Sequence, residues 1–171
     1  MTKIILETER LIVRRLELED AAFILELLNE PAFIQFIGDR GVRNLEDAQN
    51  YLVKGPLSSY EHNGFGLWMV QLKSTQESLG ICGLIKRETL PDIDLGYAFL
   101  ERYRMKGYAS EAARAVKEHA MQAKGLKRLV AITNQDNTSS IKVLEKIGMK
   151  FERLVKLSED EPELNLFAVE S

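Results

Sequence analysis

The sequence predicts an α+β fold with a mixed, mostly antiparallel sheet flanked by helices. Two observations lead to this fold class. In the middle of the chain, two runs of strand type, 66–72 and 79–86, are joined by the short polar segment 73–78, which favours an antiparallel hairpin. Further on, strand 93–100, a long helix and strand 129–132 follow one another, and such a right-handed crossover makes its two strands parallel.

The other elements follow from apolar spacing and from helix caps and breakers. Pro31 and the Gly55-Pro56 pair are expected to end helices, Asn44 can cap one, and Gly125 ends the long helix. In chain order we predict strands over 10–16, 66–72, 79–86, 93–100, 129–132, 149–157 and 163–169, and helices over 22–28, 32–37, 45–54, 110–124 and between Asn137 and Gly148.

Composition limits the class of protein. The chain has 171 residues, 45% of them hydrophobic, which predicts one domain spanning residues 1–171. Charged residues of both signs are interspersed and the formal net charge is -3, so we expect no nucleic-acid partner. No apolar run reaches the roughly 20 residues needed to cross a bilayer, and no secretory leader is visible. With a single cysteine, Cys82, we expect a cytoplasmic protein without a metal site.

The stretch 93–109 is the most informative part of the chain. A strand runs into a basic loop and a glycine turn that opens a helix, so several backbone N–H groups converge where the helix dipole favours negative charge. Arg102, Arg104 and Lys106 precede Gly107, which predicts a phosphate site. The alternative is a solvated cationic loop.

The strand before this turn has two unlike faces. Leu95, Tyr97 and Phe99 alternate with Asp94, Gly96 and Ala98. The second face is bare and leaves room for a thin extended ligand beside one ionisable group. Alternatively, Gly96 marks a bulge and Asp94 is a solvated strand residue.

Two motifs at this point of the chain resemble the GNAT superfamily of acyl-CoA-dependent N-acetyltransferases. The turn 104–109, Arg-Met-Lys-Gly-Tyr-Ala, is similar to its Arg/Gln-x-x-Gly-x-Gly/Ala signature. The block 137–149 resembles its Asn-x-x-Ala/Ser and Glu-Lys-x-Gly-Phe elements, and the resemblance covers about residues 9–169. The segments 8–14 and 94–97 look more like the branch containing ribosomal-protein alanine N-acetyltransferases (Rim-type) than the histone-modifying branch.

The resemblance implies a GNAT-like fold with acetyl-CoA bound at a splayed parallel strand pair. The pyrophosphate would rest on main-chain N–H groups of the turn, the preceding strand would pair with the pantetheine amides, and Asn137 would hydrogen-bond pantetheine. The residues expected to bind acetyl-CoA are Phe99, Leu100, Arg102, Arg104, Met105, Lys106, Gly107, Tyr108, Ala109, Ser110, Asn137, Ser139 and Ser140. Arg102, Arg104 and Lys106 keep the solvated loop as their alternative, and Asn137 and Ser140 that of helix capping.

The resemblance also implies a mechanism of direct attack by an amine, without metal or covalent intermediate. Asp94 is the candidate base, with a water relay as the alternative, and the Leu100 N–H or that of a neighbour would stabilise the oxyanion. The family tyrosine that protonates the leaving thiolate is replaced by Leu144. Ser140, Tyr108 or solvent is the candidate substitute, and the alternative is that the thiolate leaves unprotonated.

The acceptor, a primary amine on a protein N-terminus or a small molecule, is expected to lie against residues 29–63 and the closing hairpin. Phe33, Phe36 and Trp68 are candidate walls, and core packing is the alternative for each. A homodimer is implied as a possibility. The competing functions are an acyl-CoA sensor without turnover and a nucleotide-phosphate enzyme. The latter is disfavoured because the turn lacks Gly-Lys-Ser/Thr.

Overall fold

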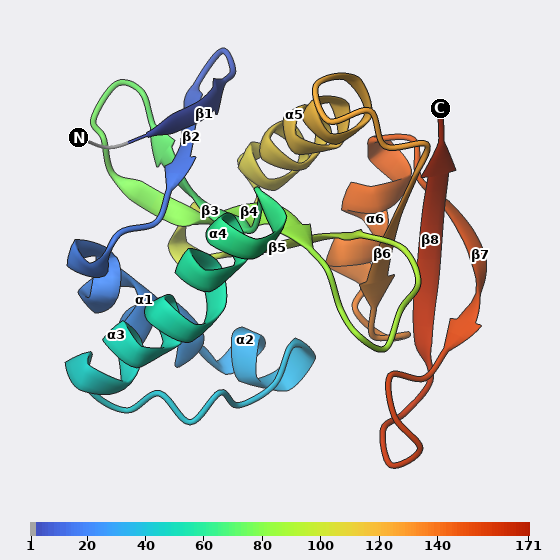
Figure 1. Ribbon diagram of the computed structural model, residues 1–171, viewed down its shortest axis with the longest axis horizontal. Coiled ribbons are helices and arrows are strands. Elements are labelled where there is room, and N and C mark those ends of the chain that lie inside the picture. The colour runs from blue at the N-terminus through green and yellow to red at the C-terminus, as the bar shows by residue number, and fades with distance from the viewer. Residues whose placement is uncertain (1–2) are drawn as a thin grey trace.

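The computed structural model describes residues 3–171 as a mixed sheet of strands covered by helices (Figure 1). The strands are β1 (Ile4–Glu7), β2 (Leu11–Arg15), β3 (Leu67–Leu72), β4 (Ser78–Ile85), β5 (Asp94–Phe99), β6 (Arg128–Thr133), β7 (Lys150–Val155) and β8 (Leu164–Glu170). The helices are α1 (Ala21–Leu28), α2 (Pro31–Phe36), α3 (Leu45–Leu52), α4 (Ser58–Asn63), α5 (Tyr108–Gln122) and α6 (Thr138–Lys146), with shorter turns η1 (Leu18–Asp20), η2 (Val53–Leu57) and η3 (Glu101–Tyr103).

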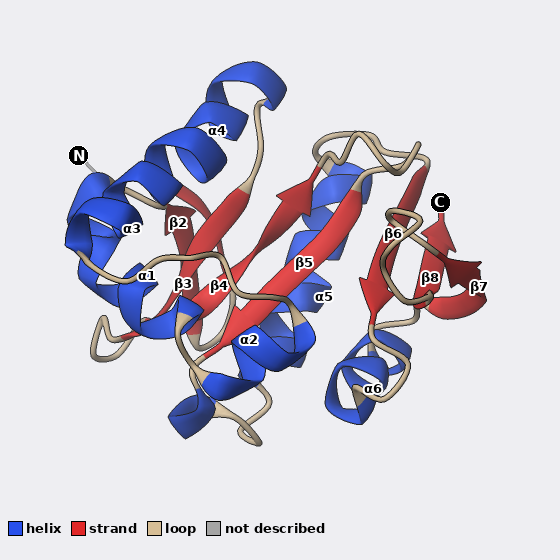
Figure 2. Ribbon diagram, turned by 90° about the horizontal axis from the view of Figure 1, so that it is seen from below, coloured by secondary structure: helices blue, strands red, loops and turns tan. Residues whose placement is uncertain are grey.

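The strand order in the described sheet is β1-β2-β3-β4-β5-β6-β8-β7. Its neighbouring pairs are antiparallel except β5 with β6, which run parallel and share one register position, Asp94 opposite Val130. Beyond that position the two strands diverge, as Figure 2 shows. The sheet is therefore open in its middle, between β5 and β6.

The two faces of the sheet carry separate cores. Strand residues such as Trp68, Cys82 and Phe99 pack with the small residues of α5 and with α6. On the opposite face, Met69 and Ile81 pack with α1, α2 and α3. Because side chains alternate along a strand, β3, β4 and β5 each serve both cores.

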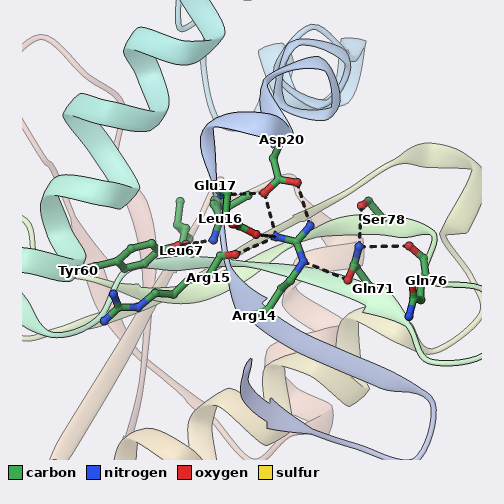
Figure 3. A network of polar contacts seen from close by, with 10 residues as sticks. All are labelled: Arg14, Arg15, Leu16, Glu17, Asp20, Tyr60, Leu67, Gln71, Gln76 and Ser78. Atoms are coloured by element: carbon green, nitrogen blue, oxygen red, sulfur yellow. Dashed lines mark hydrogen bonds and ion pairs between the residues drawn. The ribbon is translucent and has the colours of Figure 1, made fainter. Parts of the chain in front are cut away.

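A polar network fastens the first helices to the sheet (Figure 3). Arg14 of β2 forms two 2.9 Å bonds with the carboxylate of Asp20, at the start of α1, and a 3.1 Å bond with Gln71 of β3. The Tyr60 hydroxyl, on α4, accepts the Leu16 N–H at 3.0 Å and donates to the Leu67 carbonyl. These contacts, made by side chains largely removed from solvent, fix α1 and α4 against β2 and β3.

The predicted fold class is confirmed, and the individual elements differ at a few places. Strand β1 was not predicted, and Gly55-Pro56 does not end the helical region as expected. The chain passes through Pro56 in a wider π-helical turn, which accommodates the proline ring and its missing N–H, and continues as α4. Pro31 occupies the first turn of α2, where its fixed φ suits a helix start.

Among residues 3–171, no helix combines the length and the apolar character that a membrane span requires.

The centre of the sheet depends on close backbone contact at Gly83. A Cβ placed there would lie 2.0 Å from the Gly66 carbonyl oxygen and 2.7 Å from the Leu67 Cα. We expect Gly83→Ala to lower the free energy of unfolding by about 1 to 3 kcal/mol, because backbone cannot yield as a side chain can. Gly55→Ala is the control, since it meets nothing within 4 Å. Equal urea midpoints for the two variants would contradict this packing.

Candidate active site

The start of α5 presents unpaired backbone donors. Gly107 precedes the helix with φ 82°, a left-handed conformation that glycine adopts without strain. The first helical bond runs from the Glu111 N–H to the Gly107 carbonyl at 3.1 Å. The N–H groups of residues 108–110 precede that bond and have no helical partner, so they are available to an anion. Met105 also has a positive φ, 63°, and its side chain is fully exposed.

The arginine side chains of the loop do not stand free beside this helix terminus. Arg102 pairs with Glu26 of α1 at 2.6 Å. Arg104 donates to the Phe99 carbonyl at 3.1 Å and lies 3.8 Å from the Glu30 carboxylate. The alternative of a solvated cationic loop therefore describes Arg102 and Arg104 only in part, because both side chains have partners in the protein. An anion at this terminus would meet mainly backbone N–H groups, with the exposed Lys106 beside them.

Strand β5 has one paired edge and one open edge. The Leu100 N–H donates to the Leu79 carbonyl at 2.9 Å, so β4 already occupies the predicted oxyanion donor. In an antiparallel pair, successive residues point their backbone groups to alternate sides. The N–H and C=O groups of Tyr97 and Phe99 therefore point toward β6, where the strands have diverged.

Asp94 is buried at the base of this opening. Its residue is 1% exposed, which overturns the alternative of a solvated strand residue. The Nε atom of Arg87 lies 3.3 Å from both carboxyl oxygens and donates to Oδ2, which leaves Oδ1 buried without a hydrogen-bond partner. Burial raises the pKa of Asp94 to about 6, and the charge of Arg87 opposes that rise.

The bare face predicted around Gly96 is covered by neighbouring side chains. A Cβ at Gly96 would meet Cδ1 of Ile85 at 2.8 Å and Cδ2 of Leu67 at 3.5 Å. The register of β4 with β5 runs without a shift from Asp94 to Phe99, so Gly96 is not a bulge either. The unpaired edge of β5, and not this face, is therefore the part of the strand left open to a ligand.

Helix α6 brings a hydroxyl pair to the opening. Asn137 caps α6 by accepting the Ser140 N–H at 3.3 Å, and Ser140 Oγ lies 2.7 Å from the Tyr97 hydroxyl. Ser139 is exposed in the same first turn. Sequence reasoning placed Tyr97 only on an apolar face. Tyr97 could have been recognised as a site residue from its hydroxyl, because its side chain points to the face of the sheet that α6 covers.

The remaining predicted residues divide between the core and the surface. Leu144 is fully buried in the core beneath α5, so the family tyrosine position carries packing and no polar group. Phe33 and Trp68 are also buried, and Trp68 contacts His119 edge-on at 5.8 Å. Phe36 is half-buried, and its carbonyl accepts a 3.0 Å bond from Asn134, just beyond β6. Of the three candidate acceptor walls, Phe36 alone is both partly exposed and near the opening.

Comparisons with known proteins identify the family of the chain. Residues 10–150 match the family model described as an acetyltransferase (GNAT) domain, so the chain belongs to the GNAT acetyltransferase family. It is 30% identical over 149 residues to YnaD of Bacillus subtilis, named an uncharacterized N-acetyltransferase, covering 87% of this chain and 84% of YnaD.

Solved structures share the fold. The chain is similar to an acetyltransferase from Agrobacterium tumefaciens, with a TM-score of 0.82, 26% identity and coverage of 100% of this chain and 95% of that one. It also has the fold of RimL, a ribosomal L7/L12 alpha-N-protein acetyltransferase solved with coenzyme A, with a TM-score of 0.82, 19% identity and 98% coverage of both chains. The predicted resemblance to GNAT enzymes, with Rim-type structural neighbours, is confirmed.

The buried carboxylate of Asp94 has a consequence for stability. Since its folded pKa of about 6 lies above the usual 3.8, the folded protein binds an extra proton between these values. Ionisation therefore costs stability as pH rises through 6, by about 2 to 3 kcal/mol in full. We expect Asp94→Asn to raise the melting temperature at pH 7.5, with a gain that shrinks toward pH 4.5.

Asp39→Asn is the matched control with the opposite sign. Asp39 is an exposed carboxylate whose pKa is lowered by its hydrogen bond with Arg43, so its contribution is present at neutral pH and is lost on acidification. A melting temperature of Asp94→Asn below that of the wild type at both pH values would show that ionisation of Asp94 does not destabilise the folded protein.

Proposed function

We propose that the protein transfers an acetyl group from acetyl-CoA to a primary amine by direct attack in a ternary complex. The observation that carries the proposal is the coincidence of two open backbone sites. The free N–H groups at the start of α5 fit a pyrophosphate, and the open edge of β5 fits an extended chain of amides. The open edge of β5 begins at Asp94, and Ser140 of α6 lies 2.7 Å from the Tyr97 hydroxyl of the same strand.

Backbone supplies most of the acetyl-CoA binding in this proposal. The amides of residues 107–110 would hold the pyrophosphate, and Gly107 and Ala109 are small enough to let it approach them. Phe99 would pair with pantetheine through the edge that faces β6, after its carbonyl exchanges the Arg104 guanidinium for a ligand amide. The carboxamide of Asn137 and the exposed hydroxyl of Ser139 would line the same channel.

Asp94 is the proposed base. An amine is mostly ammonium at neutral pH and must lose a proton before it can attack a thioester. With a pKa of about 6, Asp94 is ionised at neutral pH and able to accept that proton. At 1% exposure the carboxylate cannot meet a bulky acceptor directly. Its unpartnered Oδ1 favours transfer through a bound water.

We place the groups that stabilise the oxyanion and protonate the leaving thiolate at the opening between β5 and β6. Because the Leu100 N–H is occupied by β4, we assign the oxyanion donor to the β6-facing N–H groups of Tyr97 and Phe99. Ser140 is the proposed acid for the thiolate and regains its proton from solvent, while the Tyr97 hydroxyl 2.7 Å away positions its Oγ. Burial raises the pKa of Tyr97, which keeps that hydroxyl protonated.

Thiol release with a panel of amines tests the activity. Peptides with free N-termini, polyamines and amino acids are incubated with acetyl-CoA, and release that depends on the acceptor supports the proposal. Saturable binding of acetyl-CoA without release for any amine would favour the sensor function instead. A homodimer and a cytoplasmic location stay predictions.

Gly107→Glu tests the pyrophosphate site. The substitution adds a negative charge at the turn and a side chain that meets Arg10, so we expect loss of acetyl-CoA binding by calorimetry, at least about 100-fold. Gly125→Glu is the matched control, because Gly125 has a similar φ of 67° at the far end of α5 and nothing within 4 Å. Equal binding by the two variants would refute this location.

The pH dependence of turnover tests Asp94. For the wild type we expect kcat/KM to rise with pH through about 6, as the carboxylate loses its proton. Asp94→Asn should retain acetyl-CoA affinity, lose about 100-fold in kcat and lose this limb of the profile. An unchanged profile in the variant would remove Asp94 as the base.

A further inference from the structure

Arg10, in the turn between β1 and β2, contacts the pyrophosphate turn from about a hundred residues away in the sequence. Its Nε atom donates to Glu111 Oε1 at 2.7 Å, and its Nη1 atom donates to the Lys106 carbonyl at 3.1 Å. The guanidinium also lies over the Tyr108 ring, 4.5 Å from the centroid. One side chain thus holds the residue before Gly107, the residue after it and the first turn of α5.

The contact with Lys106 controls the direction of a neighbouring N–H group. In a planar trans peptide, the carbonyl of one residue and the N–H of the next point in opposite directions. Because Arg10 holds the Lys106 carbonyl, the Gly107 N–H points away from Arg10. A Cβ built on Gly107 would lie 3.3 Å from Arg10 Nη2, so the guanidinium also closes one side of the glycine.

The contact with Glu111 removes a charge conflict. This carboxylate lies in the first turn of α5, beside the amides that would receive a phosphate, and unpaired it would repel an anion there. It instead accepts bonds from Arg10 Nε, from the Arg10 backbone N–H at 3.0 Å and from the Thr8 hydroxyl at 2.5 Å. The turn between β1 and β2 therefore neutralises and holds it.

From these contacts we infer that Arg10 is a positioning residue for acetyl-CoA. It orients the Gly107 amide through the Lys106 carbonyl and cancels the charge of Glu111 at the mouth of the phosphate site. The inference rests on the proposed function, because it concerns the ligand assigned there. Thr8 and Glu111 act with Arg10 as one unit that joins the N-terminal strands to the pyrophosphate turn.

The test compares two acetyl donors, one with and one without the pyrophosphate that Arg10 is inferred to help bind. Wild type, Arg10→Ala and Arg10→Lys are assayed with acetyl-CoA and with S-acetylpantetheine, which lacks the pyrophosphate and nucleotide. We expect Arg10→Ala to lose at least about tenfold in acetyl-CoA affinity and kcat/KM, the effect of one charged hydrogen bond, and to keep wild-type kcat/KM with S-acetylpantetheine. Arg10→Lys, which keeps the charge, should lose less.

Glu111→Gln separates the two roles. In the Arg10→Ala background it should recover part of the lost affinity, because the uncompensated carboxylate is gone while the Lys106 carbonyl stays unheld. Lys73→Ala is the control, since it removes an exposed cation paired with Glu7 at 3.6 Å on the same edge of the sheet. Equal losses with both donors, or wild-type affinity in Arg10→Ala, would overturn the inference. Absence of acetyl-CoA binding in the wild type would instead overturn the proposed function.

Discussion

The divergence of β5 and β6 after one shared position is the constraint on which the rest of the site depends. On its other side β5 is held by six register positions with β4, and β6 is held by six with β8, so neither strand can move to close the opening. Backbone groups that face such an opening need water or a ligand, because burying them unpaired is costly. The sheet therefore contains an edge in its interior, where a ligand can pair with it from within the fold.

The alternation of side chains along β5 separates the two groups that we propose to transfer protons. Asp94 shares its face with Ala98, which packs toward α1 to α3, whereas Tyr97 faces α6 and Ser140. The proposed base and the hydroxyl that holds the proposed acid therefore lie on opposite faces of the sheet. Between them, the backbone groups of Tyr97 and Phe99 face the opening.

Much of this arrangement could be predicted from local patterns. The Gly107 turn, the parallel crossover and the Asn137 cap each depend on residues near one another in sequence, and they lie where predicted. What could not be predicted depends on distant partners. The occupation of the Leu100 amide requires the register with Leu79, and the cover over Gly96 requires Ile85 of the neighbouring strand. The prediction that Gly55-Pro56 ends the helix was wrong for another reason, because a π-helical turn has no strong sequence signal.

The pairing of the loop arginines limits how a chain with a net charge of -3 could hold the polyanion that we propose as its ligand. Arg102 and Arg104 turn toward Glu26 and Glu30, so their charge is partly spent within the protein. In the proposed function, recognition would depend on amides aimed by the geometry of the turn, and on removing opposing charge, more than on adding positive charge. Such a site would be sensitive to residues behind the turn that orient its peptides. Its specificity would then come from backbone direction, which composition and net charge do not reveal.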